Sequence, residues 1–418
     1  MAREQEGEVM GDGCLPADRD VDGTAEQDSR PVRVLYSFPH QLGLTGIGTT
    51  ALNQVLGLVA AGADVCVSCT SLAVEVPLRV RVVETLRFGG RRIPHRALGI
   101  DRAWRYHDWQ TAQLLRRLSP AFQVVHTWPL GALSTLRMAR QAHAVSFREV
   151  PNTHTRNAYA EADREARLTG VPPALGSSHT FDPRRLAREL DEYAVADRLL
   201  VPSENVASTF LREGFMPSKI IRHHYGYDPA RFRPAPCYRR KDGPLTVAFV
   251  GRGEPRKGLH YALEAWLACG AGQRGGRFIV CGDLAPEYRP YLGRWLQHPS
   301  VEIRGFVPEV AGLLQEIDAL VLPSVEEGSA LVSYEAMACG AIPVVSSAVG
   351  ACCRHGESGL VHEPRDVATL TAQLTALDAD LRLRRRLRAG ALKAARSLTW
   401  ETAGRVLLCR YGDALKAA

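Results

Sequence analysis

The sequence predicts an α/β protein made of two doubly wound domains that face a central cleft. Short apolar runs alternate with helix-like stretches through both halves of the chain, which is typical of parallel sheets. A length of 418 residues exceeds what one ordinary hydrophobic core contains. A Pro-rich, charged segment at residues 228–244 separates the two halves and is typical of a linker. We therefore expect ligands to bind between two domains of similar size.

Composition sets the domain boundaries. Residues 1–30 are rich in Asp, Glu and Gly and poor in large apolar side chains, so we expect a disordered tail there. We place the N-terminal domain at residues 31–236, the C-terminal domain at residues 237–399 and a last helix at residues 400–418.

Each half contains its own series of strands and helices. In the first half we expect strands at residues 32–38, 64–68, 123–126, 144–147, 198–203 and 220–225, and helices at residues 49–61, 184–196 and 205–214. In the second half we expect strands at residues 245–250, 277–281, 301–304, 319–322 and 342–346, and a helix that begins at Leu259.

Bulk composition indicates a soluble cytoplasmic protein. Hydrophobic residues make up 45% of the chain and charged residues 23%, and the net charge of +7 is modest for this length. Cys66 and Cys69 have C-x-x-C spacing but lie in an apolar strand, so we interpret them as buried free thiols in a reducing compartment. The N-terminus lacks an apolar signal region, and no segment has the ~20 apolar residues that span a bilayer.

The charge distribution favours no macromolecular partner. Arg-rich runs at residues 102–117 and 382–388 would permit peripheral contact with anionic lipid, but we prefer solvated helix faces. No nucleic-acid-binding module or dense basic stripe is present in the sequence. Only five of the 52 basic residues are Lys, which is typical of a GC-rich bacterial genome.

Two glutamates follow the strand expected at residues 319–322. Glu327 lies in the loop after that strand, and Glu335 lies one to two turns into the next helix. In an open α/β sheet, ligands bind at this edge, where loop amides and a helix N-terminus suit an anion. Ionised carboxylates accept hydrogen bonds from sugar hydroxyls. Phosphate together with hydroxyls indicates a nucleotide sugar.

A second loop carries the complementary cations. Arg252 and Lys257 lie in the Gly-rich segment 251–258, directly after the strand at residues 245–250. Glycines let the backbone approach a diphosphate, and the two cations offset its charge. The loop matches neither a Walker motif nor a dinucleotide fingerprint.

These motifs resemble those of the family-4 glycosyltransferases of the GT-B fold, which have two Rossmann-like domains. The resemblance runs from about residue 32 to the C-terminus. Its strongest parts are segments 251–258 and 323–345, and segments 196–203 and 225–228 support it. It implies a retaining transfer of a sugar from a nucleoside-diphosphate sugar to a hydroxyl acceptor, with no cofactor and no metal.

The resemblance also implies roles for individual residues. The N-terminal domain would bind the acceptor, the C-terminal domain would bind the donor, and the last helix would cross back to the N-terminal domain. Arg252 and Lys257 would hold the diphosphate, Glu327 would face the donor sugar, Glu335 would hold the ribose, and His126 would lie beside the sugar. Further donor contacts would come from Gly46, Gly48, Phe306, Val307, Ser329, Ala330 and Leu331.

Two departures from the family pattern affect the sugar contacts. The family often has Gly-Phe-Gly after the first glutamate, whereas this chain has Gly328, Ser329 and Ala330. In the first half, Gly46 and Gly48 stand where adjacent glycines are usual. For the acceptor we single out His154 and Arg156, which follow the strand at residues 144–147, although a structural role for this loop fits equally well.

The mechanism and the acceptor stay open at this point. The resemblance favours front-face attack assisted by the leaving phosphate, and a covalent intermediate on Glu327 is the alternative. A Asp-x-Asp pattern at Asp378 and Asp380 lies in a charged helical region, so we do not interpret it as a metal site. A small natural product, a glycan or a lipid-linked glycan would each serve as acceptor. An epimerase- or phosphorylase-type enzyme and a degenerate binding protein remain as alternatives.

Overall fold

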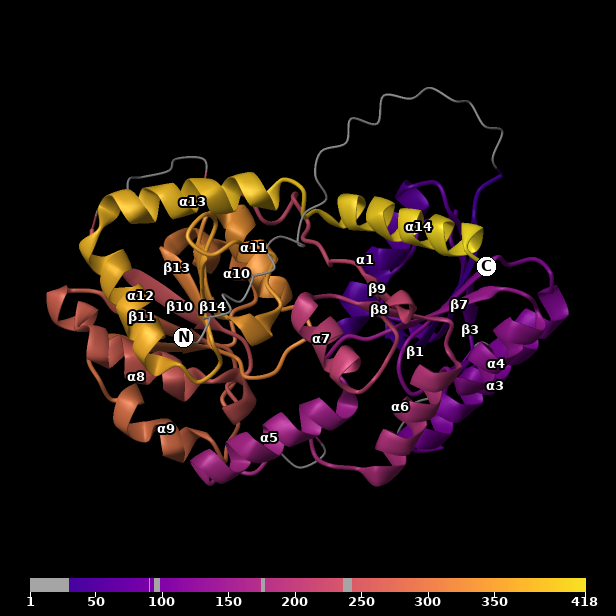
Figure 1. Cartoon of the computed structure of the whole chain (residues 1–418), viewed down its shortest axis with the longest axis horizontal. Helices are drawn as coiled ribbons and strands as arrows, with labels where there is room; N and C mark the ends of the chain where they lie inside the picture. The colour runs from indigo at the N-terminus through magenta and orange to yellow at the C-terminus, as the bar shows by residue number, and fades with distance from the viewer. Residues whose placement is uncertain (1–29, 90, 94–97, 174–176, 236–242) are drawn as a thin grey trace, which may run out of the picture. The chain divides into compact units, whose positions relative to one another are not determined.

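Two parallel sheets form the framework of the protein in the computed structural model (Figure 1). The structure describes residues 30–89, 91–93, 98–173, 177–235 and 243–418. The predicted disordered tail, apart from Arg30, and residues 236–242 of the predicted linker lie outside the described residues.

The N-terminal sheet has seven parallel strands in the order β3-β2-β1-β6-β7-β8-β9. The strands are β1 (Arg33–Leu42), β2 (Asp64–Leu72), β3 (Arg81–Glu84), β6 (Val124–Thr127), β7 (Val145–Glu149), β8 (Arg198–Val201) and β9 (Ile220–Arg222). A separate antiparallel pair consists of β4 (Arg87–Phe88) and β5 (Arg91–Arg92).

Alternation along β1 explains why helices cover both faces of this sheet. Val34, Tyr36 and Phe38 pack into one buried cluster with the first and last helices of the chain, whereas Leu35 packs into another. A strand that is buried on both faces in this way is typical of doubly wound folds. The helices are α1 (Ile47–Ala60), α3 (Ile100–Leu118), α4 (Leu133–Gln141), α5 (Thr155–Thr169), α6 (Pro183–Val195) and α7 (Glu204–Arg212), with a 3-10 turn η1 (Pro217–Lys219).

The C-terminal sheet has six parallel strands in the order β12-β11-β10-β13-β14-β15 and one continuous core. Its strands are β10 (Thr246–Val250), β11 (Arg277–Cys281), β12 (Val301–Gly305), β13 (Ala319–Leu322), β14 (Ile342–Ser346) and β15 (Leu360–His362). Its helices are α8 (Leu259–Cys269), α9 (Arg289–Leu296), α10 (Val310–Glu316), α11 (Leu331–Cys339), α12 (Val367–Ala379) and α13 (Leu381–Ala395), with 3-10 turns η2 (Pro255–Lys257), η3 (Ala271–Arg274) and η4 (Ser347–Val349).

The last helix, α14 (Trp400–Lys416), packs against α1 (Figure 1). We call the N-terminal sheet with its helices the N-terminal unit, and the C-terminal sheet with its helices the C-terminal unit. The two helices touch backbone to backbone, because a Cβ on Gly404 would lie 2.2 Å from the carbonyl carbon of Gly57. Leu407 and Tyr411 of α14 also enter the core beneath β1. The N-terminal core therefore includes residues from both ends of the described chain.

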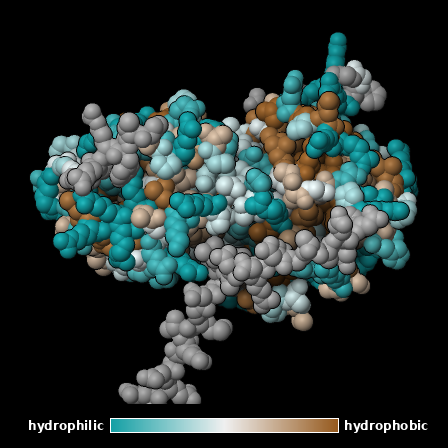
Figure 2. Space-filling model, turned by 90° about the horizontal axis from the view of Figure 1, so that it is seen from above, coloured by the Kyte–Doolittle hydropathy of each residue, from teal (hydrophilic) through white to brown (hydrophobic). Residues whose placement is uncertain are grey.

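The prediction of two doubly wound α/β domains is confirmed. Two predicted strands end earlier than expected. The strand at residues 198–203 ends at Val201. The strand at residues 220–225 ends at Arg222, because the side chains of His223 and Tyr225 both turn to the buried carboxylate of Glu149. Figure 2 shows that hydrophobic residues gather mainly on the side of the N-terminal unit in the view from above.

Every helix among the described residues is too short or too polar to span a lipid bilayer.

Candidate active site

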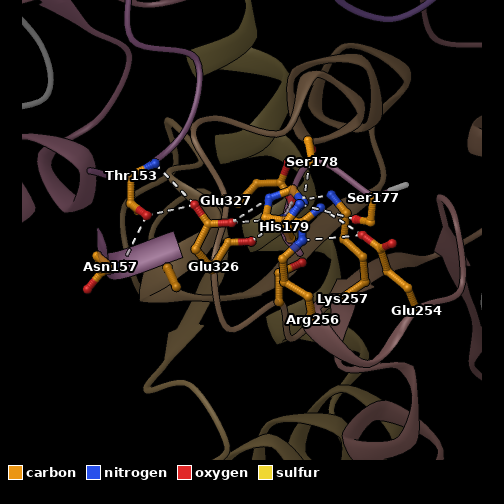
Figure 3. Close-up of polar contacts among 12 residues, drawn as sticks. Thr153, Asn157, Ser177, Ser178, His179, Glu254, Arg256, Lys257, Glu326 and Glu327 are labelled. Atoms are coloured by element: carbon orange, nitrogen blue, oxygen red, sulfur yellow. Dashed lines mark hydrogen bonds and ion pairs between the residues drawn. The ribbon is translucent and has the colours of Figure 1, made fainter. Parts of the chain in front are cut away.

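The two predicted donor loops meet at one edge of the C-terminal sheet. Strands β10 and β13 are parallel neighbours, so the loops that follow them leave the sheet side by side. Lys257, from the first loop, forms an ion pair with Glu327, from the second (Figure 3). Arg252 lies in the same loop as Lys257, and its side chain is exposed. The structure thus brings a lysine and a carboxylate together and leaves an arginine at the rim.

Arg256, which the sequence analysis did not single out, lies beneath this pair. Its Nη1 donates to the Glu326 carboxylate at 3.1 Å and to Glu327 Oε2 at 3.4 Å, and its Nη2 donates to Glu254 at 2.9 Å. Burial alone would lower the pKa of Arg256, but the carboxylates of Glu327 and Glu326 raise it above its usual value. The guanidinium is therefore a permanent cation that fixes the floor of the site.

Glu326 connects the two units at this site. Its Oε1 accepts hydrogen bonds from the amide of Thr153 at 3.1 Å and from the Thr153 hydroxyl at 2.7 Å. Its Oε2 lies 3.3 Å from His179 Nε2 (Figure 3). Burial would raise the pKa of this carboxyl, but the hydrogen bond from His179 and the charge of Arg256 hold it well below its usual range. Glu326 is therefore ionised, fully buried and held from both sides of the cleft.

A close backbone approach explains the small residue that follows Glu327. A Cβ on Gly328 would lie 1.7 Å from the carbonyl oxygen of Pro151, which follows β7 in the other unit. The carbonyl of Gly328 also accepts a 2.7 Å hydrogen bond from Ser203. The loops at the carboxyl ends of both sheets therefore touch at the site, where open α/β sheets bind ligands.

Helix α11 begins directly after this loop and carries the second glutamate of the predicted pair. Ala330 is its N-cap residue, and no side chain caps the first turn, so its terminal amides keep their partial positive charge. The hydroxyl of Ser329 contacts Tyr334 at 2.7 Å and fixes the loop. Burial raises the pKa of Glu335 to about 7, and Arg231 offsets part of this effect.

The remaining predicted donor residues lie at element ends. Phe306 and Val307 follow β12, and Phe306 is 73% exposed. Gly46 precedes α1 with a φ of +82°, which favours glycine. A Cβ on Gly48 would lie 2.7 Å from the carbonyl oxygen of Gln41, so the loop's own packing requires this glycine.

His126, which we expect beside the donor sugar, has partners within the N-terminal unit and α14. Its side chain is fully buried on β6, with Nδ1 2.6 Å from the Tyr411 hydroxyl and Nε2 3.3 Å from Glu149. Burial lowers the pKa of His126, and Glu149 offsets part of this effect. The ring joins α14 to the N-terminal sheet, and no face of it is open to a sugar.

The two tentative acceptor residues also have partners within the protein. His154 is fully buried, caps α5 by accepting from the Arg156 amide, and packs against Tyr193. The Arg156 side chain forms a 2.6 Å ion pair with Glu213. Neither residue lines the large cavity of the N-terminal unit. This cavity has a volume of about 1090 Å³, and residues of α3 and α6 form part of its wall. Among the described residues, no group of three or more His, Cys, Asp or Glu side chains is arranged to hold a metal ion.

The fold and the paired loops define a glycosyltransferase of the two-sheet GT-B class. Residues 244–380 match the family model described as glycosyl transferases group 1. The D-inositol 3-phosphate glycosyltransferase of Actinosynnema mirum is 30% identical over 327 residues, which cover 70% of this chain and 73% of that protein. The chain belongs to the glycosyl transferases group 1 family.

Other relatives and solved structures agree with this family. The glycogen synthase of Mycobacterium tuberculosis is 28% identical over 319 residues, covering 73% of this chain and 68% of that protein. The fold is similar to that of sucrose-phosphate synthase from Thermosynechococcus elongatus, with a TM-score of 0.67, 19% identity, and coverage of 93% of this chain and all of that one. It is also similar to that of Anabaena Alr3699/HepE in complex with UDP and glucose, with a TM-score of 0.60, 15% identity and the same coverage.

Proposed function

We propose that this glycosyltransferase moves a sugar from a nucleoside-diphosphate sugar to an acceptor hydroxyl, with retention of configuration and without a metal. The observation that carries this proposal is the ion pair of Lys257 and Glu327 beside the uncapped N-terminus of α11, with the exposed Arg252 in the same loop as Lys257. A diphosphate placed there would meet two cations and the helix amides. The structure of HepE in complex with UDP and glucose supports a donor of this kind.

Glu335 has the properties that a ribose ligand requires. It lies on α11 behind the amides, and among the described residues no hydrogen-bond donor or ion-pair partner contacts its carboxylate. Its raised pKa reflects burial without a close counter-charge. Two ribose hydroxyls would supply the missing donors.

The contacts of Glu327 favour front-face attack over a covalent intermediate. Lys257 and Arg256 both contact its Oε2, and these two positive charges lower the nucleophilicity of the carboxylate. In the mechanism that we propose, the leaving diphosphate accepts the acceptor proton, and Arg252 and Lys257 stabilise the charge that develops on its oxygens. Lys257 would then move from Glu327 to the phosphate when the donor binds.

A cytoplasmic setting is part of the same proposal. Cys66 and Cys69 are free and buried on β2, and burial raises the pKa of both thiols. Buried free thiols at this spacing fit a reducing compartment.

Nucleotide binding tests the donor assignment. A thermal-shift panel with UDP, GDP, ADP, CDP and dTDP should identify one nucleotide that stabilises the wild type by about 2.7 kcal/mol at ~100 times its dissociation constant. Lys257→Ala should abolish this shift, whereas Lys393→Ala, which changes an exposed lysine on α13, should leave it unchanged. A shift that persists in Lys257→Ala would refute the role of this lysine.

Turnover tests the chemistry and the metal prediction together. Arg252→Ala should lower donor hydrolysis or transfer by ~100-fold or more, because it removes one electrostatic stabiliser of the leaving group. Activity should be unchanged in excess EDTA. Near-normal turnover of Arg252→Ala, or loss of activity with the chelator, would contradict the corresponding part of the proposal.

A further inference from the structure

The large cavity of the N-terminal unit combines apolar walls with arginine side chains. We call it the acceptor-side cavity; it is lined by residues of α3, of the segment after β6 and of the start of α6. Trp104, Trp128 and Phe181 are its aromatic lining residues, of which Phe181 is exposed and Trp128 is fully buried, and Ile100 adds an exposed aliphatic side chain. Phe181 is 64% exposed, which is costly for a phenylalanine unless something covers it. This lining suits a ligand with an aromatic or alicyclic body.

Two arginines in this cavity have no carboxylate partner among the described residues. Arg105 makes only a long contact, 3.4 Å, from its Nε to the carbonyl of Asp101 on its own helix. The Arg184 side chain makes no hydrogen bond or ion pair within the described part of the chain. The carboxylate of Asp182, which also lines the cavity, is engaged by backbone amides at the start of α6. Both guanidinium groups are therefore available to an anion.

The carboxylates in the wall behind Arg105 and Arg184 do not neutralise the positive charge of these two arginines. Arg185 and Arg188 also line the cavity, and they pair with Glu189 at 3.0 Å and with Glu192 at 3.8 Å. Those two carboxylates are also bound, at 3.2 Å each, by the fully buried Arg148. Three guanidinium groups thus share two carboxylates, so this wall of the cavity keeps a net positive charge.

The cavity lies next to the site of sugar transfer. Pro151 and Asn152 line it, and the neighbouring Thr153 donates to Glu326 while the Pro151 carbonyl touches the Gly328 position. Ser177 lines both this cavity and a pocket that Arg256 lines from the other unit. A molecule in the cavity would therefore reach the cleft with its near end.

We propose that the acceptor-side cavity selects an acceptor that joins an aromatic or alicyclic body to an anionic group, held by Arg105 and Arg184. This inference rests on the proposed function, because it names the class of its acceptor. A volume of about 1090 Å³ slightly exceeds the ~300–1,000 Å³ range of ligand pockets, so the cavity has room for an acceptor larger than one sugar ring. The anionic group is a carboxylate or a phosphate, which have the same charge-assisted geometry with arginine.

Isosteric probes test this selectivity by calorimetry. We expect 2-naphthoate or 2-naphthyl phosphate to bind the full-length protein at least about tenfold more tightly than neutral 2-naphthamide, because a hydrogen bond to a charged group is worth about one order of magnitude. The better of the two acids identifies the anionic group. The Arg105→Gln/Arg184→Gln variant should lose this preference, whereas Arg102→Gln, which changes an exposed arginine of the same helix outside the cavity, should keep it.

Three results would overturn the inference: no binding of either acid, equal binding of acid and amide, or an unchanged preference in the double variant. Nucleoside-diphosphate binding, measured on the same samples, separates this test from the test of the donor site. The double variant should bind the diphosphate like the wild type. If the wild type binds no nucleoside diphosphate but still prefers the acid to the amide, the donor proposal alone is refuted.

Discussion

Replacing Glu326 with Gln should destabilise the protein more than any exposed charge change. The carboxylate is fully buried and contacts Thr153 and His179 from the N-terminal unit and Arg256 from the C-terminal unit. The amide of Gln has a similar volume and would still accept one hydrogen bond, but it leaves the buried Arg256 with one fewer counter-charge. Breaking a buried pair in this way costs about 3–5 kcal/mol.

The expected change in melting temperature follows from the size of the folded unit. An unfolding entropy of about 2.1 cal/mol/K per residue gives roughly 0.8 kcal/mol/K for about 390 residues that unfold together. The loss of about 3–5 kcal/mol then lowers Tm by roughly 4–6 °C, measured by calorimetry at pH 7. Glu357→Gln, which removes an exposed carboxylate with a 3.9 Å contact, should change stability by less than about 0.5 kcal/mol.

The dependence on pH gives this prediction a second test. Because the folded pKa of Glu326 is depressed, its contribution is fully present above the unfolded value of about 4.3 and is lost as pH falls toward the folded value. The difference in Tm between wild type and Glu326→Gln should therefore shrink below pH ~4. A Tm within 1 °C of the wild type at pH 7, or a difference that does not change with pH, would refute the assignment of a charged bridge between the two units.

Three further changes have definite expected outcomes. Glu335→Gln should stabilise the ligand-free protein at pH 8 by up to ~3 kcal/mol and have little effect at pH 4, because a carboxyl with a raised pKa of about 7 loses stability as pH rises from ~4.3 through that value; equal effects in denaturant titrations at both pH values would contradict this. Gly328→Ala should lower turnover at least about tenfold, because its Cβ would overlap the Pro151 carbonyl, and wild-type rates would mean that the loops can separate freely. Tyr411→Phe should cost about 1–3 kcal/mol by leaving His126 Nδ1 without its buried partner, and an unchanged Tm would refute that contact.

The sequence was sufficient for the fold because its strands are short apolar runs with clear ends. All six strands expected in the first half and all five in the second are present within a few residues. The edge strand β15 has only three residues, Leu360–His362, and is too short for periodicity to reveal. The early end of β9 could not be predicted, because it depends on a contact of His223 with Glu149, which lies more than seventy residues earlier in the chain.

The site was only partly predictable, for a related reason. Arg252, Lys257, Glu327 and Glu335 lie in two local motifs, and a motif can be found without knowing what faces it. The roles of Glu326 and of the cavity arginines depend on contacts between units. His126 illustrates the opposite case, because a histidine at the end of a buried strand looks the same in sequence whether it faces a ligand or a tyrosine on a distant helix.

The packing of α14 on α1 has a consequence for how the protein is made. Gly404 lies against Gly57, and Tyr411 enters a core whose other members are mostly translated several hundred residues earlier. During synthesis the N-terminal unit would emerge from the ribosome with the part of its core that α14 covers still exposed. Domains usually fold in order as they are translated, and exposed apolar surface makes incomplete ones prone to aggregate. The N-terminal unit can therefore complete its core only after the C-terminal unit and α14 have been translated.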